Sequence, residues 1–78
     1  MARLRLFAQA RESAGTASAA VGGSTVGEVL DAAAAAFGPG FAAVLATSAV
    51  WVNGEPAGRD ALVGDLDEVA VLPPVSGG

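Results

Sequence analysis

The sequence has 78 residues, of which 53% are hydrophobic and 15% are charged, and its formal net charge is −4. A chain of this size makes one small domain that buries about 60% of its unfolded surface, and its hydrophobic content excludes an intrinsically disordered protein. Cysteine, histidine and lysine do not occur. Their absence excludes disulfides, most zinc sites and His-dependent nucleophiles, and leaves no side chain that could receive an isopeptide bond.

Charge and hydropathy narrow the partners that we expect. Residues 1–12 carry a balance of +2 and residues 13–78 a balance of −6. Such an acidic body disfavours nucleic acid and suits a basic partner surface. No apolar run reaches the roughly 18–20 residues that span a bilayer, and Arg11-Glu12 interrupts any targeting segment. We therefore expect a cytoplasmic protein with no membrane and no nucleic-acid partner.

Residues 3–7 predict the first strand, because their side chains alternate between two faces. The aliphatic face carries Leu4 and Leu6, and the opposite face carries Arg3, Arg5 and Phe7. Residues 8–13 predict a short loop or helical turn, which Gly15 closes. Residues 16–21 predict a second strand that pairs back as a hairpin, and Gly22-Gly23 predicts the turn that follows.

Residues 25–37 predict the main helix. Thr25 and Glu28 match a capping box at its start, and Gly38-Pro39 ends it. Its larger apolar residues recur at the spacing of a single buried stripe, namely Val26, Val29, Leu30, Ala33 and Phe37. The polar face has no lysine or arginine, which indicates a core helix rather than one that lies on a membrane.

The second half of the chain predicts one or two helical turns at residues 41–45 and then strands at 49–52, 55–57 and 68–72. Asn53-Gly54 is a strong hairpin signal between the first two of these strands, and a proline marks the return strand as an edge. Trp51 faces away from its valine neighbours. A partner contact would explain this residue, but we favour partial burial beneath a loop.

The acidic cluster Asp65, Asp67 and Glu68 lacks the ligand spacing of a calcium loop and predicts a solvated turn. In the strand that follows it, Val69 and Val71 form the inward pair, which leaves Leu72 on the other face.

This order of elements predicts an α+β domain of the β-grasp (ubiquitin-like) class, with one main helix across one face of a mixed sheet. We assign residues 1–72 to this domain and residues 73–78 to a flexible, extended C-terminal Gly-Gly tail. In this topology the first and last strands are neighbours. Phe7 and Leu72 would then form an apolar patch on the open face, at the base of the tail.

The tail combines a stiff root with a bare tip. Pro73 and Pro74 cannot continue an interior strand, because neither has an N–H to donate. The six residues can reach about 20 Å, and terminal glycines fit a channel too narrow for a Cβ. A frayed chain end is the alternative. We predict that the tail enters a partner's active site, with Gly78 as the reactive acyl end, preceded by Gly77, Ser76, Val75, Pro74 and Pro73.

Four stretches resemble the small subunit of molybdopterin synthase, a ubiquitin-like sulfur carrier: residues 6–15, 25–30, 52–55 and 67–78. The resemblance implies that an ATP- and magnesium-dependent enzyme adenylates Gly78 and that the product is converted to a thiocarboxylate. It also implies a heterotetramer with the large subunit, in which the sulfur reaches a pterin precursor of the molybdenum cofactor. It assigns partner docking to Phe7, Arg11 and Leu72, and no metal or cofactor to this chain. The chain departs from the usual pattern at Gly64 to Asp67, which puts the contacts of that loop in doubt.

Other functions stay open. The chain could carry sulfur for thiazole, cysteine or tRNA thiolation, or it could be a ubiquitin-like modifier or a non-covalent β-grasp binding module. As the small subunit of molybdopterin synthase, the chain would be a non-catalytic subunit that is active only with its partner, because no phosphate-binding loop occurs in the sequence.

Overall fold

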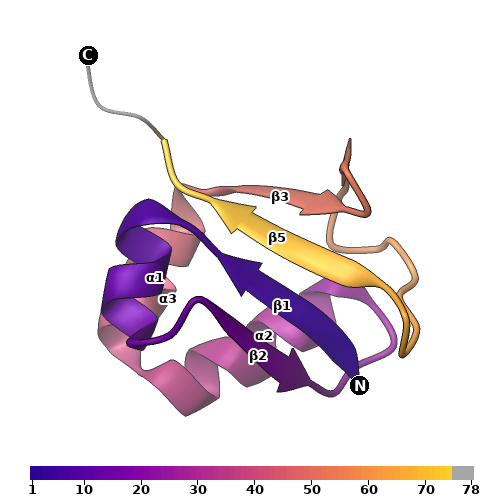
Figure 1. The fold of residues 1–78 in the computed structure, drawn as a ribbon, viewed down its shortest axis with the longest axis horizontal. Coiled ribbons are helices and arrows are strands. Elements are labelled where there is room, and N and C mark those ends of the chain that lie inside the picture. The colour runs from indigo at the N-terminus through magenta and orange to yellow at the C-terminus, as the bar shows by residue number, and fades with distance from the viewer. Residues whose placement is uncertain (75–78) are drawn as a thin grey trace.

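A computed structural model describes residues 1–74 of the chain. Its elements in chain order are β1 (Ala2–Leu6), α1 (Ala8–Ala14), β2 (Ser18–Val21), α2 (Val26–Phe37), α3 (Pro39–Ala46), β3 (Ala49–Val52), β4 (Glu55–Pro56) and β5 (Glu68–Leu72). The strands form a five-stranded sheet in the order β2-β1-β5-β3-β4. The helices lie behind this sheet and leave its front face open (Figure 1). This is the β-grasp arrangement that the sequence predicts.

The two central strands come from opposite ends of the described chain. β1 and β5 run parallel, with Leu4 opposite Val69 and Leu6 opposite Val71. β2 pairs antiparallel with β1, and β3 pairs antiparallel with β5. The predicted adjacency of the first and last strands is therefore confirmed, and with it the inward direction of both valines.

The core fills the space between the sheet and the helices. The inward-facing apolar residues of β1 and β5 are at most 2% exposed, and Val29 of α2 and Phe41 of α3 are fully buried. Each such side chain stabilises the fold by about 1.5–3 kcal/mol relative to an exposed one. Phe37 packs edge-on against Phe41 with ring centroids 5.2 Å apart, which ties the end of α2 to α3.

The start of α2 is held by side chains and by a distant loop. The Glu28 N–H donates to Thr25 Oγ1 at 3.2 Å, which confirms the predicted N-cap. Glu28 Oε1 accepts from the Ser24 N–H at 2.8 Å, one residue before the N-cap rather than at Thr25 itself. The backbone N–H groups of Val26 and Gly27, the first two residues of α2, donate to the carbonyls of Ala61 and Arg59 in the 59–61 loop. Helix starts leave such donors unpaired unless a partner is supplied.

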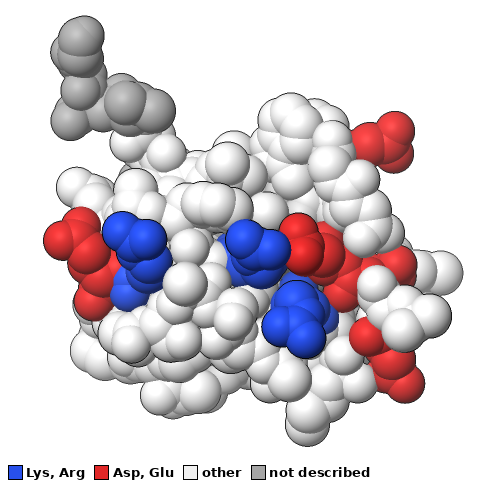
Figure 2. Space-filling view, in the orientation of Figure 1, with Lys and Arg blue, Asp and Glu red and all other residues white. Residues whose placement is uncertain are grey.

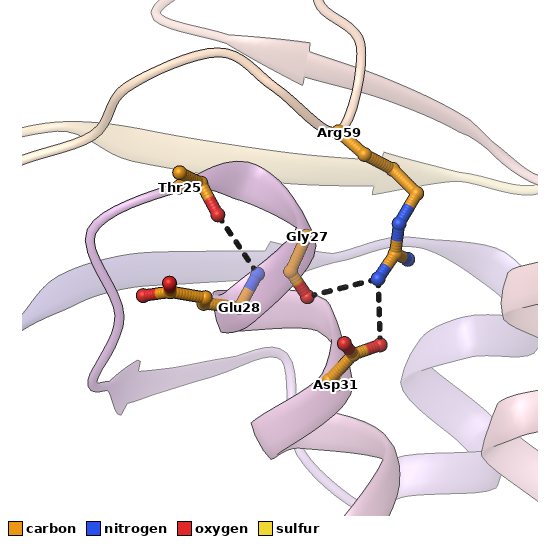
Figure 3. Close-up of polar contacts among 5 residues, drawn as sticks. All are labelled: Thr25, Gly27, Glu28, Asp31 and Arg59. Carbon is orange, nitrogen blue, oxygen red and sulfur yellow. Dashed lines mark hydrogen bonds and ion pairs between the residues drawn. The ribbon is translucent and has the colours of Figure 1, made fainter.

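Arg59 fastens the same loop to the helix a second time. Its Nη2 donates to Asp31 Oδ1 at 2.8 Å and to the Gly27 carbonyl at 3.3 Å (Figure 3). A Cβ at Gly27 would come within 3.1 Å of that same nitrogen. Glycine at this position therefore leaves the room that the guanidinium uses.

Two segments are more helical than the sequence predicts. Residues 8–14 form a complete helix rather than a loop or helical turn, with Ala10 fully buried and Gly15 in the left-handed conformation at its end, φ +77°. Pro39 does not only end α2. It also begins α3, because the fixed φ of proline suits the first helical position.

Candidate functional site

The open face of the sheet carries an apolar patch, which we define as Phe7, Ala49, Trp51, Ala70 and Leu72. Its three large side chains, Phe7, Trp51 and Leu72, are 41%, 38% and 36% exposed. The ladders bring the patch together, because Trp51 lies opposite Ala70 and Ala49 lies opposite Leu72. Phe7 directly follows Leu6, whose partner Val71 precedes Leu72. Phe7 and Leu72 therefore follow directly on paired residues of neighbouring strands, both exposed, and their role in docking stays a prediction.

Trp51 extends this patch across a third strand. The sequence favoured its partial burial beneath a loop, but the structure places it on the open face in the same cross-strand row as Ala70 and Arg5. The alternation in β3 already indicated the face opposite Val50 and Val52. The pairing of β3 with β5 was needed to show that this face is the same one that carries Leu72.

Arginines border the apolar patch on the β1 side. Arg5 Nη1 lies 3.5 Å from Glu68 Oε2, and its Cζ lies 5.9 Å from the centroid of the Phe7 ring. Arg3 projects from the same face of β1. Figure 2 shows blue side chains across the front of the molecule with red side chains beside them, and Glu68 lies opposite Arg3 on the same face. This face therefore carries both signs of charge, and a basic partner surface stays a prediction.

Arg11, the third predicted docking residue, lies one helical turn after Phe7. Its N–H donates to the Phe7 carbonyl at 3.4 Å, and its side chain is exposed on α1. The structure thus connects Arg11 with Phe7 through the start of α1, whereas Leu72 reaches Phe7 through the sheet.

The chain leaves the sheet at the end of β5 (Figure 1), directly after Leu72 of the apolar patch. β5 ends at Leu72, Pro73 is buried and Pro74 is exposed. The buried Pro73 therefore anchors the root of the tail in the domain, whereas Pro74 is exposed to solvent. The remaining predicted tail residues, Val75, Ser76, Gly77 and Gly78, lie outside the described residues, so the role of the tail stays a prediction.

At the opposite end of the sheet, hydrogen bonds close the acidic turn. The Gly64 N–H donates to Asp67 Oδ2 at 2.8 Å, and Asn53 Nδ2 donates to Asp67 Oδ1 at 2.9 Å. The Asn53 amide and the Gly64 N–H hold the pKa of Asp67 below its usual value. The N-terminal ammonium group, 2.6 Å from Asp65 Oδ1, likewise lowers the pKa of that carboxyl. The loop whose contacts the sequence left in doubt is thus a closed turn joined to the 53–54 hairpin.

A cavity of about 400 Å³ lies on the helix side, away from the apolar patch. Residues of α2, α3 and β3 line it, together with the Asp31–Arg59 pair. Among residues 1–74, no group of three His, Cys, Asp or Glu side chains could hold a metal ion. No helix in this part of the chain is long and apolar enough to cross a membrane.

The sheet order and the helix packed across one face define a β-grasp protein. The sequence profile of the ThiS family matches residues 4–78, and the chain belongs to the ThiS family.

Solved structures show the same relationship. SAMP1 from Haloferax volcanii is 36% identical, with a TM-score of 0.81 over 97% of each chain. The small archaeal modifier protein 1 from Methanosarcina acetivorans is 29% identical, with a TM-score of 0.88 over 99% of this chain and 95% of that one. A chain of the BexX/CysO complex from Amycolatopsis orientalis is 28% identical, with a TM-score of 0.83 over the full length of both. The chain therefore shares its fold with small archaeal modifier proteins and with a chain of the BexX/CysO complex.

Proposed function

We propose that this chain is a sulfur carrier whose Gly78 carboxylate is converted to a thiocarboxylate, and that it serves as the small subunit of molybdopterin synthase. The observation that carries the proposal is the position of the apolar patch at the root of the tail. An enzyme that docks on Phe7, Trp51 and Leu72 would receive the segment that begins at Pro74. Membership in the ThiS family supports the same role.

The chemistry requires activation, because a carboxylate is a poor electrophile. The Gly78 carboxylate attacks the α-phosphorus of ATP, and pyrophosphate leaves. Hydrosulfide then attacks the acyl carbon and expels AMP, so that the C–O bond to phosphate breaks, a C–S bond forms and the S–H proton is lost. With a persulfide of the partner as donor, the first product is an acyl disulfide, and a second thiol of the partner cleaves its S–S bond, which releases the thiocarboxylate and leaves a disulfide on the partner. The product is an anionic thiocarboxylate, which is a nucleophile at neutral pH. ATP, magnesium and the catalytic side chains belong to the partner in this scheme, and the use of ATP fits a cytoplasmic location.

Molybdopterin synthase is favoured by the sequence around the tail. The stretch from Asp67 to Gly78 and the stretch from Leu6 to Gly15 carry the resemblance to its small subunit. In the structure Leu72 of the first stretch and Phe7 of the second follow directly on the paired residues Val71 and Leu6 of neighbouring strands. A large subunit that recognises both would bind the patch and take up the tail, and two such pairs would make a heterotetramer.

The second candidate is a protein modifier, which the similarity to a small archaeal modifier protein favours. The activated carboxylate would then be attacked by an amine of a target protein, and an amide bond would form with loss of AMP. The similarity to CysO, which was solved in a complex with BexX, supports a partner protein in either case.

Intact mass spectrometry tests the carrier step. The protein is incubated with an adenylating enzyme of this family, ATP, magnesium and sulfide. We expect a mass increase equal to the exchange of one oxygen for sulfur, and no increase in a variant without Gly78. An increase that persists in the deletion variant would contradict the proposal.

A second assay separates the two candidates. The thiocarboxylated protein is mixed with a molybdopterin synthase large subunit and the cyclic pterin precursor, and dithiolene formation is followed. Product formation supports the molybdopterin role. Covalent adducts with other proteins and no dithiolene would instead support the modifier.

A further inference from the structure

Phe7 of the apolar patch has a fixed backbone but an exposed ring. Its carbonyl accepts the N–H groups of Ala10 at 3.0 Å and Arg11 at 3.4 Å, which hold it at the start of α1. The β1–β2 ladder ends with Arg5 opposite Ser18, so Phe7 has no paired residue in β2. The ring is 41% exposed. An exposed side chain changes rotamer rapidly unless a neighbour restricts it.

Arg5 is such a neighbour. It lies two residues before Phe7 in the chain, and successive side chains of an extended strand alternate, so both project from the open face. The Arg5 Cζ lies 5.9 Å from the centroid of the Phe7 ring, within the distance at which a guanidinium is attracted to an aromatic face. The planar guanidinium therefore restricts the positions that the ring can take.

Glu68 in turn holds Arg5. Arg5 Nη1 lies 3.5 Å from Glu68 Oε2, and each side chain is 45% exposed. The strand register places Arg3 directly opposite Glu68, yet the ion pair is the diagonal one with Arg5. Within residues 1–74 no ion pair of Arg3 is found. An exposed ion pair contributes little to stability, so its main effect is on the position of the Arg5 side chain.

The backbone of Glu68 is fixed by the 53–54 hairpin. The Glu68 N–H donates to Asn53 Oδ1 at 2.9 Å, and the Glu68 carbonyl accepts the Asn53 N–H at 2.9 Å. A chain of contacts therefore runs from the hairpin through Glu68 and Arg5 to the ring of Phe7.

We infer that Arg5 is a positioning residue for docking: Glu68 holds its guanidinium, and the guanidinium holds the Phe7 ring in the orientation that a partner enzyme binds. The inference rests on the proposed function, because it requires that the partner enzyme contacts Phe7. In the complex the guanidinium and the ring lose water together, and the attraction between them grows as water is excluded. Arg5 therefore affects docking through Phe7, whereas Arg3, which has the same charge on the same face, does not.

NMR of the free full-length protein tests the two contacts. The ring current of Phe7 should shift the δ-proton resonances of Arg5 upfield. Phe7→Leu should abolish this shift, and Glu68→Gln should reduce it, because the neutral amide holds the guanidinium less firmly. The δ-protons of Arg3 are the control and should not respond to Phe7→Leu. If either change left the Arg5 resonances in place, the inference would be overturned.

Titration calorimetry against an adenylating enzyme of this family tests the effect on docking. Arg5→Met and Arg3→Met are a matched pair, because each removes one positive charge from the same face of β1 and keeps an unbranched side chain. Arg5→Met should bind about three- to tenfold more weakly than the wild type, and Arg3→Met should change binding by less than about twofold. Arg5→Lys, which keeps the cation, should recover most of the affinity. Equal weakening in the matched pair would show a general effect of charge and overturn the inference.

A double variant tests whether Arg5 acts through the ring. In a Phe7→Leu protein, the further change Arg5→Met should leave the affinity unaltered, because the side chain that Arg5 positions is gone. A full additional loss would show that Arg5 contacts the partner directly, which contradicts a positioning role.

Failure of the proposed function gives a different result. A wild-type chain that binds neither the adenylating enzyme nor a molybdopterin synthase large subunit would contradict the proposed function, and the inference would be refuted with it. A wild-type chain that binds, with Arg5→Met indistinguishable from Arg3→Met, would refute the inference alone.

Discussion

Trp51 of β3 lies directly opposite Ala70 of β5, and its indole is 38% exposed on the face that also carries Leu72. A large aromatic side chain in this setting can fill a pocket of a partner, and residues that do so dominate the energy of many interfaces.

The first prediction concerns Trp51 as a reporter and an anchor. Trp51 is the only tryptophan in the chain, so its fluorescence should shift to shorter wavelength when a partner enzyme covers the apolar patch. Trp51→Ala should weaken partner binding by about 2 kcal/mol or more. Its loss of thermal stability should be smaller than its loss of binding energy. An unchanged emission spectrum in the complex would show that the partner binds elsewhere.

The second prediction uses two neighbouring residues of β5 that face opposite sides. Leu72→Asp should change the free energy of unfolding by about 0.5 kcal/mol but should weaken partner binding by about 2 kcal/mol or more, since it buries an unpaired carboxylate in the interface. Val71 is fully buried, and Val71→Asp should unfold the domain. Circular dichroism melting and titration against the partner measure both effects. Equal melting of the two variants would contradict the assignment of Leu72 to the open face.

Local patterns predicted most of the elements, whereas tertiary contacts determined the rest. The capping box at Thr25 and the Asn53-Gly54 turn act within a few residues, so both could be read from the sequence. The helix from Ala8 to Ala14 could not, because a segment this short is not stable alone and depends on burial of Ala10 in the core.

The sequence likewise predicted only part of the candidate site. Alternation within single strands identified Phe7 and Leu72, and the β-grasp topology predicted from the order of elements placed the first strand beside the last. The contribution of Trp51 depends on the pairing of β3 with β5, which no local pattern encodes. The same holds for the burial of Pro73, because a proline after a strand reads as the start of a tail.

The third prediction distinguishes two adjacent glycines that the sequence treats alike. Gly23 has a φ of +145°, and a Cβ there would lie 2.8 Å from the Val29 nitrogen, whereas a Cβ at Gly22 would meet nothing within 4 Å. Gly23→Ala should therefore destabilise the protein by about 2 kcal/mol or more. Gly22→Ala should change stability by about 0.5 kcal/mol at most. Urea denaturation measures both, and equal midpoints would contradict the close approach at Gly23.

The fourth prediction concerns the junction between β1 and α1. Ala8 has a φ of +49°, a conformation that costs a residue with a Cβ about 1–2 kcal/mol. Ala8→Gly should therefore raise the free energy of unfolding, by up to about 1 kcal/mol after the extra chain entropy of glycine. The control is Ala14→Gly in the same helix, which should lower stability by about 0.5–1 kcal/mol. A loss of stability in Ala8→Gly would show that this junction is not strained.

The fifth prediction concerns the pH dependence of stability. Hydrogen bonds from Asn53 and Gly64 lower the pKa of Asp67 in the folded state, so the ionised carboxylate stabilises the fold at pH values above its ordinary pKa of 3.8 in the unfolded chain. This contribution is lost as the pH falls through the lower, folded value. Asp67→Asn should be less stable than the wild type at pH 7, and the difference should shrink below about pH 4. Melting curves from pH 2 to pH 7 measure it, with Asp60→Asn as a control that should follow the wild type. A constant difference across this range would contradict the hydrogen-bond assignment.

The parallel pairing of β1 with β5 affects when the protein can be recognised by its partners. Leu4 pairs with Val69, so the centre of the sheet closes only after nearly the whole described chain has been synthesised. Contacts so distant in sequence form late and slow the folding of a domain. Until β5 is in place, Phe7 and Trp51 have no common neighbour, and the apolar patch does not exist. A partner that requires this patch would therefore engage finished molecules and pass over nascent or misfolded ones, so that docking also checks the integrity of the fold.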